Sequence, residues 1–150
     1  MARVLLVFGP PGHGKTTLAE KLRIEHAFHR MSADDVYVEF VRAYFPTFYF
    51  AELRNCILQH YDFIFRLDPA RRQAWCQHLL NGIILAASNH PKVVVDGYQL
   101  YDCKDAIETV LKEASHQVFQ LKVEDFGATE VYQGLQPRLT AAEIAGLGDD

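Results

Sequence analysis

Long hydrophobic runs are missing from this sequence of 150 residues. Its longest apolar stretches, such as Ile83 to Ala87 and Val93 to Val95, are far shorter than the roughly 20 residues that a helix needs to cross a bilayer. The apolar run Val4 to Phe8 is also too short for a signal peptide, and a glycine ends it. We therefore expect a cytoplasmic protein with no membrane segment, in which Val4 to Phe8 forms a buried strand.

Cysteine and basic residues are scarce as well. The three cysteines, Cys56, Cys76 and Cys103, form neither a CxxC pair nor a zinc-binding spacing. We expect reduced, partly buried thiols rather than a disulfide framework or a metal site. The formal net charge of −4 and the pI of about 5.9 disfavour broad electrostatic binding to nucleic acid, but they leave room for a local basic groove.

Internal repeats, low-complexity tracts and linkers are absent too, and the chain is long enough to bury a core. The expected strands are Val4 to Phe8, Phe28 to Met31, Val93 to Val95 and, as the last one, Val118 to Val123. The first expected helix runs from Thr16 to about Glu25, and a second helical region begins near Val36 in two parts separated by Pro46. A third helix begins at Asp68-Pro69 and stops at Asn89-His90-Pro91. Asp102 is expected to cap another helix, and a short terminal helix is expected at Ala141 to Ile144. This alternation predicts one α/β domain over residues 1–150, a three-layer, doubly wound sandwich with a mostly parallel sheet of four to five strands.

Two of these helices carry a distinct apolar face. In the helix that begins at Asp68-Pro69, the buried face is expected to consist of Trp75, Leu79, Ile83 and Ala87. In the helix after Asp102, it is expected to consist of Ile107, Val110, Leu111 and Ala114, with Glu108 and Lys112 paired on the outside. Both helices should therefore pack against the sheet.

One segment carries specific chemistry. Gly9 to Thr16 fits the pattern G-x-x-x-x-G-K-[ST] and lies directly between an apolar strand and a helix. Its glycines let successive backbone N–H groups turn toward phosphate oxygens, and the N-terminus of the helix adds positive charge. Lys15 would then reach the β- and γ-phosphates, and the Thr16 hydroxyl would bind Mg²⁺. The pattern predicts ATP and Mg²⁺ as cofactors.

The predicted nucleotide-binding residues are continuous in sequence: Gly9, Pro10, Pro11, Gly12, His13, Gly14, Lys15, Thr16 and Thr17. We expect His13 to lend its backbone N–H while its side chain points outward, and a direct contact of its side chain with phosphate is the alternative. A second carboxylate, Asp96, ends the strand of three valines. It can hold Mg²⁺ together with Thr16, directly or through water, although a cap for the turn at Gly97 is the alternative role.

Three segments together resemble the small P-loop kinases grouped around polynucleotide 5′-hydroxyl kinase: Gly9 to Thr17, Ser32 to Asp35, and Val93 to Leu100. The similarity covers roughly residues 3 to 123, and the phosphate loop is its specific part. It implies the P-loop NTPase fold and an aspartate after the second strand that accepts the proton of the attacking hydroxyl. That position is Asp34, with Asp35 as a close rival. Ser32, Asp34 and Asp35 are also suitable helix caps, which is the structural alternative.

Arginines depart from the family pattern. An arginine expected one turn after the catalytic aspartate is missing, since Tyr37 and Val38 stand there. The mobile lid of such kinases supplies arginines to the transferring phosphate, and Arg138 is the candidate here, within a possible lid and terminal helix over residues 124–145. A solvated surface arginine is the alternative for Arg138. Three further arginines near a helix start could substitute, namely Arg66, Arg71 and Arg72.

Residues 36–65 are rich in aromatic rings and lie where nucleotide kinases bind their acceptor. The rings could stack on a base or nucleoside, or they could be buried in the core or a dimer interface. Tyr98, Gln99 and Tyr101 follow the strand that ends at Asp96 and are candidate acceptor contacts.

These features favour a kinase that transfers the γ-phosphate to a hydroxyl of a nucleic acid, either a 5′ end or a hydroxymethylated base, or of a nucleoside or nucleotide. A small-metabolite kinase and a nucleotide-binding ATPase or switch are the alternatives. The residue after Asp96 is Gly97, whereas resemblance to motor-type ATPases would imply a glutamate there. No Asn-Lys-x-Asp segment for reading guanine is present either. A partner-binding module with a degenerate loop is a third alternative.

Overall fold

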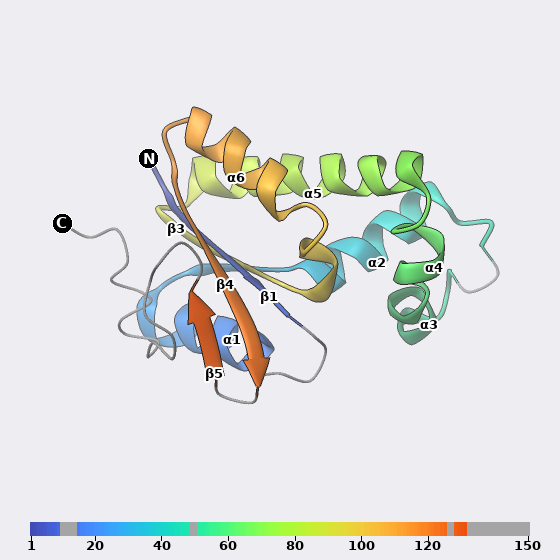
Figure 1. Ribbon diagram of the computed structural model, residues 1–150, viewed down its shortest axis with the longest axis horizontal. Helices are drawn as coiled ribbons and strands as arrows, with labels where there is room; N and C mark the ends of the chain where they lie inside the picture. The colour runs from blue at the N-terminus through green and yellow to red at the C-terminus, as the bar shows by residue number, and fades with distance from the viewer. Residues whose placement is uncertain (10–14, 49–50, 126–127, 132–150) are drawn as a thin grey trace.

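The computed structural model describes residues 1–9, 15–48, 51–125 and 128–131. Its sheet has five strands in the order β2-β3-β1-β4-β5 (Figure 1). The strands are β1 (Arg3–Phe8), β2 (His29–Ser32), β3 (Lys92–Asp96), β4 (Gln117–Asp125) and β5 (Ala128–Val131). The first four are parallel, and β5 pairs antiparallel with β4. The described strands thus form the mostly parallel sheet that the sequence predicts.

Helices cover both faces of this sheet. They are α1 (Lys15–His26), α2 (Ala33–Tyr44), α3 (Arg54–Gln59), α4 (Tyr61–Ile64), α5 (Pro69–Asn89) and α6 (Lys104–Glu113), with a 3₁₀ turn η1 (Tyr98–Leu100). In Figure 1, α1 lies along one side of the sheet, and α5 and α6 lie along the other. None of the helices in the described part of the chain is long and apolar enough to cross a membrane.

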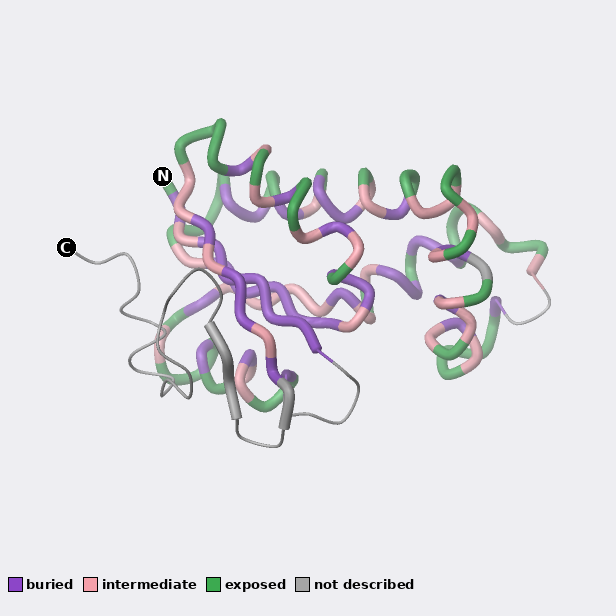
Figure 2. Tube along the Cα trace, in the orientation of Figure 1, coloured by how far each residue is buried: buried purple, intermediate pink, exposed green. Residues whose placement is uncertain are grey.

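Side chains alternate along β1 between the two sides of the sheet, as a strand buried on both faces requires. Leu5 and Val7 pack in one cluster with Ala19 and Leu22 of α1. Val4, Leu6 and Phe8 belong to the larger cluster that contains the buried side chains of α2, α5 and α6. Figure 2 shows the central strands as a buried layer between the helices. The three-layer α/β sandwich is confirmed.

The order of the strands determines where a ligand can approach. From β1 the chain passes through α1 to β2, on the far side of β3, and from β3 it passes through α6 to β4, on the far side of β1. The connections after the neighbouring strands β1 and β3 therefore leave in opposite directions. In doubly wound sheets, ligands bind outside the carboxyl ends of the strands at this point of reversal.

Local sequence signals agree with most helix boundaries. Asp68 caps α5 by accepting hydrogen bonds from the backbone N–H groups of Ala70 (3.0 Å) and Arg71 (3.3 Å), and Pro69 occupies the first turn. The predicted face of this helix, Trp75, Leu79, Ile83 and Ala87, is buried throughout. In α6, Ile107 and Leu111 are buried, Val110 is half-buried, and Ala114 is exposed, contrary to prediction.

Two predictions about the second half of the chain are wrong. The strand at Val118 to Val123 is not the last one, because β5 pairs with it in the antiparallel direction. Asp102 does not cap α6, because its carboxylate accepts hydrogen bonds from the Tyr61 hydroxyl and from Arg66 Nε, both at 2.8 Å. A hydrogen bond to a guanidinium is stronger than one to a neutral backbone N–H. The expected terminal helix at Ala141 to Ile144 lies outside the described residues.

The cysteines also differ from expectation. Cys76 of α5 and Cys103, just before α6, form a disulfide with a Cα–Cα distance of 5.3 Å, so the prediction of three reduced thiols is wrong. Their separation of 27 residues gave no signal in the sequence. They meet because α5 packs across the segment that follows β3. Cys56 is a free, half-buried cysteine.

Candidate phosphate-transfer site

The predicted phosphate loop leaves β1 at a position that only glycine can occupy. Gly9 has a φ of 145°, and a Cβ atom there would overlap the carbonyl oxygen of Val123 on β4. The five residues that follow, Pro10, Pro11, Gly12, His13 and Gly14, lie outside the described residues. The chain is described again from Lys15, the first residue of α1. The sequence thus joins a buried strand to a helix N-terminus at the carboxyl end of the sheet, where an anion is favoured.

Lys15 is buried although it carries a charge. Its Nζ donates a hydrogen bond to the carbonyl oxygen of Gly9 at 2.8 Å, so the ammonium group turns back toward the end of β1. Burial lowers the pKa of Lys15, and the nearby negative charges of Asp34 and Asp96 oppose that shift. The next residues, Thr16 and Thr17, are exposed in the first turn of α1. The lysine therefore lies between the end of β1 and two carboxylates.

Asp96 is the buried carboxylate at the end of β3, with 3% of its surface exposed. Arg30 of β2 pairs with it through two parallel hydrogen bonds, from Nε to Oδ1 and from Nη2 to Oδ2, both at 2.9 Å. Burial raises the pKa of Asp96, and Arg30 opposes this by favouring the ionised form. Each carboxylate oxygen has two lone pairs, so the pairing leaves one lone pair on each oxygen. Together with the exposed Thr16 hydroxyl, these oxygens are the hard ligands that Mg²⁺ prefers.

A second glycine brings α2 against the end of β3. Gly97 has a φ of 153°, and a Cβ atom there would lie 2.6 Å from Cβ of Ala33, the first residue of α2. The Gly97 N–H donates a hydrogen bond to the carbonyl oxygen of Val7 at 3.0 Å. In the sheet, Ser32 is aligned with Asp96. The start of α2, and with it Asp34, is therefore held beside Asp96.

The two candidate base residues differ in their surroundings. Ser32 caps α2 by accepting a hydrogen bond from the backbone N–H of Asp35 at 3.4 Å, so neither aspartate side chain is the cap. Asp35 is exposed and pairs with Arg54 at 2.6 Å. Asp34 is half-buried, and its charge acts on both Lys15 and Asp96. The structure brings Asp34, Lys15 and Asp96 together and directs Asp35 toward α3.

Of the predicted arginines, the three that the structure describes, Arg66, Arg71 and Arg72, have partners away from this group. Arg138 lies outside the described residues, as do residues 126–127 and 132–145 of the expected lid. The described part of that lid is strand instead, because residues 124–125 belong to β4 and residues 128–131 form β5. Arg66 donates hydrogen bonds to Asp102, Asp62 and Tyr98. Arg71 lies over the Phe48 ring, and Arg72 donates to the carbonyl oxygen of Arg66 at 2.9 Å. Sequence reasoning missed Arg30. Its place inside a short, half-buried strand could have pointed to it, since a charge there needs a partner.

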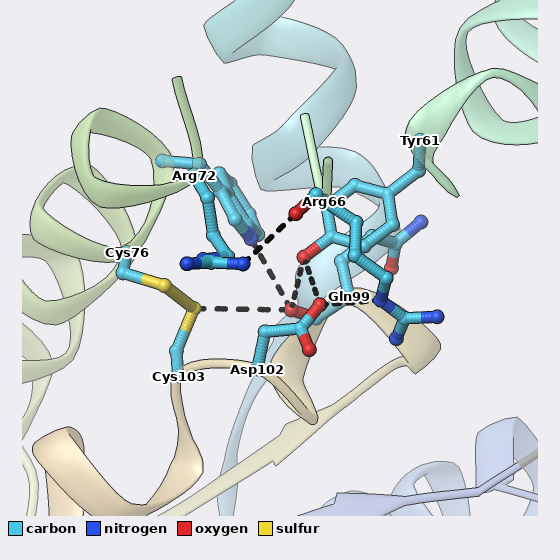
Figure 3. Close-up of a disulfide and its surroundings, with 8 residues drawn as sticks. Tyr61, Arg66, Arg72, Cys76, Gln99, Asp102 and Cys103 are labelled. Atoms are coloured by element: carbon cyan, nitrogen blue, oxygen red, sulfur yellow. Dashed lines mark hydrogen bonds and ion pairs between the residues drawn. A yellow bond between two sulfur atoms is a disulfide. The ribbon is translucent and has the colours of Figure 1, made fainter. Parts of the chain in front are cut away.

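The segment after Asp96 is fixed by a shared carbonyl group (Figure 3). The Gln99 carbonyl oxygen accepts hydrogen bonds from Trp75 Nε1 at 3.2 Å and from the Tyr61 hydroxyl at 3.5 Å. Gln99 itself is buried, and its side-chain Oε1 has no partner within the described residues. Tyr98 is half-buried and bonded to Asp62 and Arg66, whereas Tyr101 is 49% exposed. Of the three candidate acceptor contacts, Tyr101 presents the most open surface.

Half of the aromatic rings that the structure describes in residues 36–65 are buried, namely Tyr37, Phe40, Tyr61 and Phe65. Tyr37 is fully buried and makes edge-to-face contacts with Tyr61, Phe65 and Trp75, each with ring centroids 5.2 Å apart. Phe40 is buried in the same cluster. The half-buried rings are Phe45 and Phe48, the exposed ones are Tyr44 and Phe63, and Tyr49 and Phe50 lie outside the described residues. The buried alternative therefore holds for Tyr37, Phe40, Tyr61 and Phe65.

Comparison with known proteins gives a structural match and no sequence match. No family model matches the chain, and no curated protein matches it. A solved structure that matches is a cysteine-to-alanine mutant of the APS kinase CysC of Mycobacterium tuberculosis, with a TM-score of 0.53 and 14% sequence identity. The alignment covers 96% of this chain and 92% of that chain. The chain therefore shares the α/β fold of this kinase structure.

Proposed function

We propose that this protein is an ATP- and Mg²⁺-dependent phosphotransferase that acts on a hydroxyl group. The observation that carries the proposal is the meeting of Lys15, Asp34 and Asp96 at the carboxyl ends of β1, β2 and β3. Phosphoryl transfer needs positive charge on the phosphates, a metal ligand and a group that orients the nucleophile, and these three side chains are of the required types. The similarity in fold to an APS kinase supports transfer over hydrolysis.

Each residue has a stated role in this scheme. The loop of residues 9–16, including Lys15, would hold the β- and γ-phosphates, and Thr16 and Asp96 would hold Mg²⁺, which neutralises phosphate charge when bound. Asp34 would orient the acceptor hydroxyl and take its proton as the new P–O bond forms and ADP leaves. In support of this role, the Asp34 carboxylate has no hydrogen bond or ion pair within the described part of the chain. Arg138, the arginine that the sequence nominates, would add positive charge at the γ-phosphate.

The acceptor is proposed to carry a base. A nucleic acid 5′-hydroxyl, a hydroxymethylated base, a nucleoside and a nucleotide all fit the sequence resemblance to polynucleotide kinases, with residues 36–65 on the acceptor side. The exposed Tyr101 ring after η1 supports stacking, whereas the burial of Tyr37, Phe40 and Phe65 reduces the surface available for it. The net charge of −4 favours a small acceptor or a chain end over a long polymer. A small-metabolite hydroxyl is the second choice.

Transfer of labelled γ-phosphate would test the proposal. The panel should contain DNA and RNA 5′ ends, hydroxymethylated DNA, nucleosides, nucleotides and small alcohols, each with Mg²⁺·ATP. We expect ADP release that rises with one acceptor class and disappears in Lys15→Ala, because the lysine carries the positive charge at the phosphates. ADP release that is independent of every acceptor would favour the ATPase or switch, and absence of ATP binding by calorimetry would favour a partner-binding module.

A further inference from the structure

A single arginine joins three elements around the proposed metal site. Arg30 Nε and Nη2 donate to the two oxygens of Asp96 on β3, and Nη1 donates to Glu20 Oε1 of α1 at 2.6 Å. The side chain of Arg30 is 16% exposed and that of Asp96 is 4% exposed. One guanidinium, itself on β2, thus holds a carboxylate from β3 and a carboxylate from α1.

The register of the sheet explains how Arg30 reaches Asp96. Arg30 is aligned with Val94, which belongs to the cluster on the α1 face. Asp96 follows Val94 by two residues and therefore has its side chain on that same face. The guanidinium therefore reaches the carboxylate along the strand direction, from the level of Val94. Because its fork matches the plane of the carboxylate, the pairing fixes the orientation of Asp96 in a way that a point charge cannot.

Glu20 extends this arrangement to the other half of the metal site. Thr16 and Glu20 are four residues apart on α1 and so lie on the same face of the helix. The chain of contacts Glu20–Arg30–Asp96 therefore links the helix face that carries Thr16 to the strand end that carries Asp96. These two residues must be held at a fixed distance to share one metal ion.

We propose that Arg30 is a positioning residue that orients Asp96 for Mg²⁺, with Glu20 holding Arg30 in place. The inference rests on the proposed function, because it concerns the metal that accompanies ATP. In this scheme Arg30 would touch neither the nucleotide nor the metal, because its guanidinium donates to Asp96 and Glu20. A residue that only supported the fold would leave the Mg²⁺ dependence of nucleotide binding unchanged.

The test compares ATP affinity in Mg²⁺ with ATP affinity in EDTA, by calorimetry on the whole chain. The quantity of interest is the ratio of the two dissociation constants. We expect Arg30→Gln to reduce the Mg²⁺-dependent gain in affinity by roughly 10- to 100-fold, the usual effect of losing a group that orients a metal ligand, while affinity in EDTA stays close to wild type. Glu20→Gln should show a smaller loss in the same direction.

Two variants separate positioning from charge. Arg30→Lys keeps the positive charge and loses the two parallel N–H donors, so its Mg²⁺-dependent gain in affinity should be as low as in Arg30→Gln. A wild-type gain in Arg30→Lys would overturn the inference. Arg23→Gln is the matched control, because Arg23 also pairs with Glu20, at 2.7 Å, but is half-exposed and pairs with no residue of β3 in the described chain. It should keep the wild-type ratio. Thermal melting in EDTA identifies any variant that fails to fold, and Glu20→Gln and Arg30→Lys then carry the test.

The outcomes distinguish this inference from the proposed function. Wild-type protein that binds ATP no better with Mg²⁺ than with EDTA would overturn both. A wild-type protein with clear Mg²⁺ dependence, combined with an unchanged ratio in folded Arg30→Gln, would overturn the positioning role and leave the proposed function intact. An equal loss of affinity in Mg²⁺ and in EDTA would show a structural role and overturn the inference as well.

Discussion

Reduction of the Cys76–Cys103 disulfide offers a stability test whose size follows from the fold. The bond closes a loop of 27 residues that contains the second part of α5, all of β3 and η1. The loss of chain entropy on closing such a loop corresponds to roughly 3.5 kcal/mol of the free energy of unfolding at 25 °C. Residual structure in the unfolded chain reduces this figure, so it is an upper value. In a chain of this length it corresponds to a fall in Tm of about 7 to 14 °C.

The measurement is thermal unfolding followed by circular dichroism, with and without a phosphine reductant. Wild-type protein should lose several degrees of Tm on reduction. Cys76→Ala should show the lower Tm without reductant and no further change with it, and Cys56→Ala should behave like wild type, because Cys56 is not in the bond. Cys76 is the better residue to replace, since Cys103 is fully buried and its removal would also leave a cavity.

Two results would refute this reasoning. A reductant-dependent change of equal size in Cys76→Ala would show that the effect comes from somewhere other than the bond. Titration of the unfolded, unreduced protein with a thiol reagent should find one free thiol, and three free thiols would mean that the bond does not form.

Four further substitutions test the site and its support. Asp34→Asn should lower the rate of γ-phosphate transfer by at least ~100-fold while ATP binding stays nearly intact. Asp35→Asn should keep a transfer rate near wild type. Full transfer activity in Asp34→Asn would show that Asp34 is not the base. Gly97→Ala should reduce both Tm and transfer, because its Cβ would lie 2.6 Å from Ala33 and the backbone conformation is strained; a wild-type Tm would contradict this. Tyr61→Phe should lower the free energy of unfolding, measured in urea, by about 1.5 to 3 kcal/mol, since it removes a hydrogen bond to the Asp102 carboxylate. An unchanged free energy of unfolding would mean that water replaces the hydroxyl.

Much of the fold could be predicted because its signals are local. The strand before Gly9, the cap at Asp68 and the buried face of α5 each depend on residues within a few positions of one another. The parallel sheet then follows from the alternation of strands and helices. The prediction missed β5, whose four residues, Ala-Thr-Glu-Val, have too weak an apolar pattern to stand out.

The contacts that sequence reasoning missed depend on how distant segments are aligned in the fold. Arg30 and Asp96 are 66 residues apart, and they meet only because β2 pairs with β3 in a particular alignment. Cys76 and Cys103 likewise meet through the packing of α5, and Asp102 finds Arg66 through the fold rather than through its neighbours. A single sequence carries no record of such alignments. It could nominate Asp34 and Asp96, but it could not find the residue that holds Asp96.

The charges around Asp96 sharpen the test of Arg30. Lys15 and Arg30 contribute two positive charges, and Glu20, Asp34 and Asp96 contribute three negative ones, so these five side chains sum to −1. If only the local charge mattered, Arg30→Gln would make the site more negative and would strengthen the attraction of Mg²⁺. If orientation matters, the same substitution releases Asp96 from its fixed geometry and weakens Mg²⁺-dependent binding. The two explanations predict opposite signs for one ratio, so the direction of the change in Arg30→Gln is enough to decide between them.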